Sequence, residues 1–227
     1  MPNWTTRPAP SRAPMEGRYC RLEPLQADTH AGALYDAYAA FPDQSNWTYL
    51  PYGPFTSVSE YAAWISEIES VDDPIPFAIL TRPDERPVGV AAYLRVNPLQ
   101  GSIEVGHLCY SPALQRTAAA TEAMYLMMRH AFAELGYRRY EWKCDALNVP
   151  SRDAAMRLGF SFEGTFRQAV VYKGRSRDTA WFSVIDQEWI ALKETFERWL
   201  APANFDERGI QRTRLSNLTG IMLKPRG

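Results

Sequence analysis

Hydrophobic positions follow two patterns along the chain: the alternation typical of strands, and the recurrence every three or four residues typical of helices. The first pattern predicts strands at 18–25, 76–82, 87–96, 102–110 and 137–146, and a strand hairpin over 160–186. The second predicts helices at 26–41, 57–70, 118–135, 148–159 and 187–200. This order indicates a mixed α/β domain with an antiparallel first half, in which a strand–helix–strand crossover over 103–146 joins two parallel strands.

Composition narrows the class of protein. The chain has 227 residues, 46% of them hydrophobic, which suffices for one large core, and a formal net charge of −1. Such a charge argues against a broad nucleic-acid-binding surface, and no apolar run is long enough for a membrane span. The three cysteines show neither disulfide nor metal-ligand spacing, so we expect no metal, and we expect Cys109 and Cys144 to be buried thiols.

The two ends of the chain differ from its middle. Residues 1–16 are broken by prolines and lack the apolar segment of a secretory signal, which predicts an extended arm and a cytoplasmic location. Residues 17–200 contain the periodic segments and form the predicted domain. Residues 201–227 are expected to be an extension packed on its surface.

The segment 114–124, LQRTAAATEAM, lies between a predicted strand and the longest predicted helix. The first amides of a helix have no backbone partner and carry partial positive charge, so they can bind phosphate without glycine. Arg116 would add charge, and Thr117 or Thr121 a hydroxyl. This requires a negative φ at Ala118. The alternative is that the alanines only begin a helix that packs on the sheet.

The run 103–164 resembles the core of the GNAT superfamily of acyl-CoA-dependent N-acyltransferases. The family motif, Gln/Arg-x-x-Gly-x-Gly/Ala, is matched by Gln115 and Ala120, with Ala118 in place of its middle glycine. Further matching positions resemble the branch of ribosomal-protein N-terminal acetyltransferases; they are Asn148, Ser151, Leu158, Gly159, Phe160, Glu163 and Gly164.

This resemblance implies a mostly antiparallel twisted sheet flanked by helices, with one splayed pair of parallel strands that receives acetyl-CoA. Its pantetheine arm would meet the backbone of Leu108, Cys109 and Tyr110 and the side chain of Asn148. Its pyrophosphate would meet the loop and first helical turn formed by Gln115, Arg116, Thr117, Ala118, Ala119, Ala120 and Thr121. For Asn148 and Ser151, helix capping is the alternative role.

The implied reaction is direct attack of an amine on the thioester, which needs a base to take a proton from the amine. Glu104 is the first candidate, and the alternative is that it pairs with an arginine. His107 and Asp145 are further candidates. Strict alternation places His107 on the opposite face from Glu104. Ser151 would stabilise the leaving thiolate.

Two segments are candidates for the acceptor site. The aromatic residues Trp47, Tyr49 and Tyr52 lie in a loop rich in Pro and Gly that would roof the acceptor, although ordinary packing explains them equally well. The segment 173–178, KGRSRD, is the expected hairpin tip, and it either recognises an acidic substrate or lies in solvent.

The sequence therefore predicts an acetyl-CoA-dependent N-acetyltransferase that acts on a protein N-terminus or a small-molecule amine. The alternative is a non-catalytic acyl-CoA-binding module, which is favoured by three departures from the family pattern. Ala118 replaces a glycine, Ala155 stands where many members of the resembling family have a tyrosine acid, and Val170 stands where some have a glutamate. The closing strands and the terminal helix would suit a homodimer.

Overall fold

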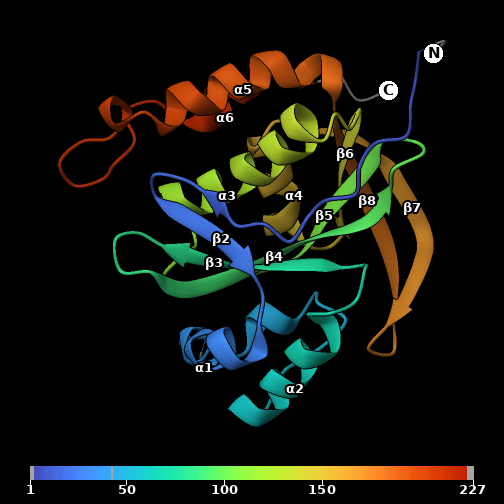
Figure 1. Cartoon of the computed structure of the whole chain (residues 1–227), viewed down its shortest axis with the longest axis vertical. Coiled ribbons are helices and arrows are strands. Elements are labelled where there is room, and N and C mark those ends of the chain that lie inside the picture. Colours follow the sequence, from blue (N-terminus) through green and yellow to red (C-terminus); the bar gives the residue numbers. More distant parts are fainter. Residues whose placement is uncertain (1–2, 42, 224–227) are drawn as a thin grey trace.

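A computed structural model describes residues 3–41 and 43–223 as one eight-stranded sheet with helices on both faces (Figure 1). The strands are β1 (Met15–Glu16), β2 (Cys20–Pro24), β3 (Ile75–Thr81), β4 (Arg86–Asn97), β5 (Ser102–Tyr110), β6 (Arg139–Asp145), β7 (Ser161–Tyr172) and β8 (Arg175–Ile185). The α-helices are α1 (Ala27–Tyr38), α2 (Val58–Ile68), α3 (Ala118–Arg129), α4 (Val149–Arg157), α5 (Asp186–Leu200) and α6 (Leu215–Thr219). Single turns of other helix types lie at Ser45–Trp47, His130–Glu134 and Pro202–Asn204.

The sheet has the order β1-β2-β3-β4-β5-β6-β8-β7, and every neighbouring pair is antiparallel except β5 and β6. The predicted fold class, including the crossover between parallel strands, is thus confirmed. The fold adds a short strand, β1, within the segment predicted to be an extended arm. Residues 1–2 of that arm and 224–227 of the predicted C-terminal extension lie outside the described residues.

Two hydrophobic clusters hold the layers together. The larger cluster packs the sheet against α3, α4 and α5, and it includes Met124, Met127 and Met128 of α3, each at most 2% exposed. The smaller cluster packs the opposite face against α1, α2 and the loop between them. Figure 1 shows α1 and α2 on one side of the sheet and the other helices on the far side.

The helix boundaries follow local sequence chemistry. The Ser57 side chain caps α2 by accepting a hydrogen bond from the amide of Glu60. The predicted helix 118–135 is α3 followed by a π-helical turn, His130–Glu134. Gly136, which comes next but one, has a φ of +70°, a conformation that glycine adopts without strain.

All three cysteines are free and buried, which confirms the prediction for Cys109 and Cys144. Within residues 3–41 and 43–223, no helix is both long and apolar enough to cross a membrane. The same ranges contain no group of three or more His, Cys, Asp or Glu side chains that could hold a metal ion.

A β-bulge in β5 overturns one expectation. Ala92 pairs with Gly106 and Val90 with Cys109, so two residues of β5, His107 and Leu108, oppose a single residue of β4. His107 accordingly has a φ of +51°. The extra residue breaks the alternation of faces, and His107 contacts Tyr52 in the cluster of α1 and α2. The prediction that His107 faces away from the side of Glu104 is therefore wrong.

Candidate active site

The parallel strands β5 and β6 separate halfway along their length. They pair only from Ser102 with Arg139 to Val105 with Trp142, although β5 continues to Tyr110 and β6 to Asp145. Beyond that point each strand has a backbone edge that its neighbour does not use. An extended amide-containing chain could pair with such an edge, as an added strand would.

The predicted backbone contacts lie on this free stretch of β5, and two of their carbonyls already have partners. The Cys109 carbonyl accepts a hydrogen bond from the Tyr38 hydroxyl at 3.0 Å, and the Tyr110 carbonyl accepts one from Gln115 Nε2 at 3.1 Å. The contacts also tie α1 and the 114–124 loop to the end of β5.

The loop before α3 reaches its helix through a strained residue. Arg116 has a φ of +62°, a left-handed conformation that costs a non-glycine residue about 1–2 kcal/mol. Ala118 begins α3 and does not have a positive φ, as phosphate binding requires. Among the described residues, no acceptor meets the amides of Ala118 and Ala119, so two donors remain at this helix end.

Neither threonine hydroxyl of this segment is free. Thr117 donates to the Leu114 carbonyl at 2.6 Å and accepts from the Ala120 amide at 3.1 Å, which makes it the N-cap of α3. Thr121 is buried and accepts from Arg157 Nη1 at 3.1 Å. The groups left for an anion are thus backbone amides and the exposed side chain of Arg116.

Asn148 and Ser151 lie together at the start of α4, which follows β6. The Asn148 side chain caps the helix by accepting a hydrogen bond from the Ser151 amide at 3.2 Å. Helix capping, the alternative role for Asn148, is therefore observed. The Ser151 hydroxyl accepts from Trp142 Nε1 at 3.0 Å. Burial raises the pKa of the nearby Cys144 thiol, and a hydrogen bond from Ser151 opposes that rise.

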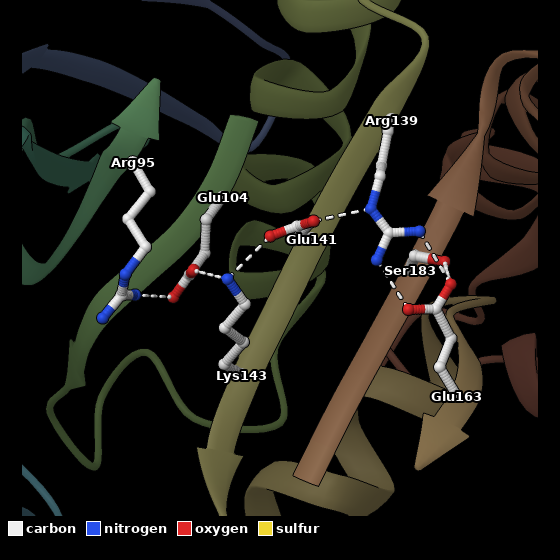
Figure 2. Close-up of polar contacts among 7 residues, drawn as sticks. All are labelled: Arg95, Glu104, Arg139, Glu141, Lys143, Glu163 and Ser183. Atoms are coloured by element: carbon white, nitrogen blue, oxygen red, sulfur yellow. Dashed lines mark hydrogen bonds and ion pairs between the residues drawn. The ribbon is translucent and has the colours of Figure 1, made fainter. Parts of the chain in front are cut away.

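Glu104 lies at one end of a charge ladder, defined here as Arg95, Glu104, Lys143, Glu141, Arg139 and Glu163. Figure 2 shows these side chains in alternating charge across the sheet from β4 to β7. Glu104 contacts Arg95 Nη1 at 2.7 Å and Lys143 Nζ at 2.8 Å, so the alternative that it pairs with an arginine is observed. Arg95 has a φ of +48° beside an irregularity in the pairing of β4 with β5.

The rest of the ladder is closely bonded. Lys143 Nζ also contacts Glu141 at 2.7 Å and lies 3.7 Å from the centre of the Trp181 ring. Arg139 donates to both oxygens of Glu163, at 2.7 and 2.6 Å. Burial would raise the pKa of Glu141, but hydrogen bonds from Arg139 and Lys143 outweigh it and lower this pKa.

Sequence reasoning missed the ladder apart from Glu104. A signal was present in the strand 139–145, where Arg139, Glu141 and Lys143 alternate with the buried Tyr140 and Trp142. Three charged residues on one face of a central strand must find partners across the sheet. That reasoning would have identified the charged face without giving its partners.

His107 lies against the Tyr52 ring beside this face. Its ring stacks on Tyr52 with a 5° interplanar angle, and its Nδ1 lies 3.2 Å from the Tyr52 hydroxyl. Burial lowers the pKa of His107, and the positive charge of Arg95 lowers it further. The neutral imidazole is therefore the dominant form at neutral pH. Asp145, the third candidate base, accepts from the Leu147 amide and from the Tyr172 hydroxyl.

One aromatic residue of this loop is buried in the smaller cluster, and another contacts the segment between β6 and α4. Trp47 is 6% exposed and packs among rings of the smaller cluster, which is the ordinary packing alternative. Tyr49 donates to the Leu147 carbonyl at 3.2 Å, between β6 and α4. The loop therefore spans from the core to the segment that carries Asn148.

The hairpin tip also contacts this loop. β8 begins at Arg175, so only residues 173–174 form the turn, and the predicted six-residue tip is wrong in extent. Lys173 Nζ donates to the Trp47 carbonyl at 2.8 Å and Arg175 to the Thr48 carbonyl at 3.4 Å. Residues 173–176 are exposed, as the alternative of a tip lying in solvent predicts, and two of their side chains also contact the aromatic loop.

Known proteins share this architecture. A solved GCN5-related N-acetyltransferase from Brucella melitensis covers 97% of this chain and 100% of its own, with 45% identity and a TM-score of 0.94. The N-acetyltransferase YnaD of Bacillus subtilis is 22% identical over 67% of this chain and 87% of its own length. The structure of Mycobacterium smegmatis RimJ in complex with CoA-disulfide covers 78% of this chain and 89% of its own, at 20% identity and a TM-score of 0.64, and so shows the fold alone. Residues 20–161 match the acetyltransferase (GNAT) domain, and the chain belongs to that family of N-acetyltransferases.

Proposed function

We propose that this chain transfers an acetyl group from acetyl-CoA to a primary amine by direct attack of the amine on the thioester. The observation that carries the proposal is the separation of β5 from β6, beside the unpaired amides at the start of α3. The free strand edge fits an amide-containing arm, and the helix end fits a pyrophosphate. Acetyl-CoA would supply the activated acetyl group.

Glu104 is the proposed base. It lies one residue before the last paired position of β5, on the face that carries the charge ladder. Arg95 and Lys143 fix its two oxygens, so the carboxylate has one orientation toward the separating strands. A proton would reach it from the amine through water. His107, neutral and on the same side of the sheet, is the second candidate for this role.

Ser151 is proposed to stabilise the leaving thiolate. Trp142 donates to its oxygen and orients the hydroxyl, whose proton would turn from Cys144 to the coenzyme thiolate. Asn148 would hold the pantetheine arm through the amide nitrogen that its capping contact does not use. The acceptor is proposed to enter under the loop that carries Tyr49 and Tyr52.

Thiol release from acetyl-CoA over a panel of amines tests the proposal. We expect turnover with at least one amine, and we expect Glu104→Gln to lower kcat/KM by about 100-fold or more, the range for loss of a general base. Glu67→Gln, an exposed change of the same kind on α2, serves as the matched control. Tight CoA binding without turnover on any amine would instead support the non-catalytic module. Full activity of Glu104→Gln at every pH would refute the base assignment.

We also propose a homodimer through β7. This strand is at the edge of the sheet and exposes Phe166, Val170 and Val171, which are 56%, 42% and 76% exposed. An exposed apolar edge strand favours pairing with a second copy. Light scattering should give twice the chain mass, and a monomeric mass at all concentrations would contradict the proposal.

A further inference from the structure

One face of β8 carries three polar groups that have no partner among the described residues. They are Arg177 Nε, Thr179 Oγ1 and Trp181 Nε1, and all three atoms are shielded from solvent. Thr179 is 5% exposed. Buried donors without partners are uncommon, and they indicate a ligand or water that completes them. We call Arg177, Thr179 and Trp181 the β8 polar strip.

The β8 polar strip begins beside the proposed base. Lys143 pairs with Trp181 across the sheet, and its ammonium contacts both the Trp181 ring and Glu104. Asp145 pairs with Thr179, and Arg177 lies two residues further, beyond the end of β6. Residues two apart on a strand share a face, so the strip leads from the charge ladder toward the hairpin tip.

Positive charge at the far end of the strip is not neutralised. Arg177 makes no hydrogen bond or ion pair within residues 3–41 and 43–223; it only lies near the Tyr172 ring, at 5.8 Å. In the part of the chain that the structure describes, Lys173 and Arg175 on the same hairpin contact carbonyls and a hydroxyl, and no carboxylate. The carboxylate of Asp145 already accepts from the Leu147 amide and the Tyr172 hydroxyl. The cations of the charge ladder, in contrast, each contact a carboxylate.

We propose that the acceptor is an amine that also bears a carboxylate, with the amine beside Glu104 and the carboxylate bound by Arg177 and Thr179. The inference rests on the proposed acetyl transfer and adds the class of acceptor. An arginine beside a hydroxyl is a suitable pair for a carboxylate, because guanidinium and hydroxyl both donate to its oxygens. Four residues separate Trp181 from Arg177, a strand length of about 13 Å. The acceptor is therefore extended, with its two charged groups far apart.

A series of ω-amino acids of increasing length, each compared with its ω-amino amide, tests the inference. The amide keeps the amine and the length but lacks the charge. For wild type we expect the longer acids to exceed their amides by about tenfold or more in kcat/KM, the size of one charged contact. Arg177→Gln should abolish this preference by lowering kcat/KM for the acids to that for the amides. Arg177→Lys, which keeps the charge, should retain part of it.

The control is Arg86→Gln, which removes the same charge from an exposed position at the start of β4 and should behave as wild type. Equal rates with acids and amides in the wild type would overturn the inference and leave the acetyltransferase proposal intact. A raised KM for acetyl-CoA in Arg177→Gln, with the acid preference unchanged, would assign Arg177 to the coenzyme and overturn it too. No turnover with any amine would instead contradict the proposed function.

Discussion

Lys143 is the side chain on which the charge ladder depends most. Its side chain is 8% exposed, and its ammonium contacts Glu104, Glu141 and the Trp181 ring. Lys143→Met keeps most of the volume and removes the charge, so two buried carboxylates each lose one cation. Removing one partner of a buried pair typically costs about 3–5 kcal/mol.

The expected loss is smaller than that range, because each carboxylate keeps a second cation. Glu104 still contacts Arg95, and Glu141 still contacts Arg139. We therefore expect the free energy of unfolding to fall by about 2–3 kcal/mol, which moves the midpoint of urea unfolding by about 1 M. The loss should change little in about 0.5 M salt, since buried pairs are weakly screened.

Lys193→Met is the matched control, because this lysine is 42% exposed and lies 3.8 Å from Glu197 one turn away. Such a surface pair contributes less than about 0.5 kcal/mol. The double variant Lys143→Met/Glu104→Gln should recover part of the lost stability, since it also removes one of the carboxylates. If Lys143→Met and Lys193→Met unfolded at the same urea concentration, the ladder would not stabilise the fold as argued here.

Three further predictions concern other parts of the site. Arg116→Gly should raise the free energy of unfolding by about 0.5–1 kcal/mol in thermal denaturation, because it relieves a positive φ; Arg116→Ala keeps the strain and should not. Ser151→Ala should lower kcat about tenfold, whereas Trp142→Phe keeps the hydroxyl and should retain most of the activity; equal losses would indicate a structural role. Burial lowers the pKa of both His30 and His107 below 6.5, so below that pH the unfolded chain binds protons more tightly. Stability should thus fall as the pH drops below about 6.5, and urea titrations should show a smaller fall in His107→Gln.

Local patterns were sufficient for most of the fold. The order of strands and helices, the cap at Ser57 and the buried methionines of α3 follow from spacing and side-chain chemistry over a few residues. The start of α3 at 117–120 can also be predicted from the sequence, because Thr117 precedes a run of alanines. Each of these features depends on neighbours in the sequence.

The features that could not be predicted from the sequence depend on neighbours across the sheet. The bulge at His107 exists because two residues of β5 oppose one of β4, and no alternation within 102–110 shows it. The partners of Glu104 come from Arg95 on one strand and Lys143 on another. The contact of Lys173 with the Trp47 carbonyl joins residues 126 positions apart. Such pairings become visible only when the strands have been placed beside one another.

The most direct test of the central claim is a single turnover with acetyl-CoA labelled with carbon-13 in the acetyl group, an accepted amine, and an excess of enzyme. Mass spectrometry follows the label on the amine and on the protein at successive times. Direct attack predicts that the label appears in the amide of the acceptor as CoA is released, and never on the protein. Label that accumulates on a side chain of the protein before it reaches the amine would contradict the account, as would CoA release without any labelled amide.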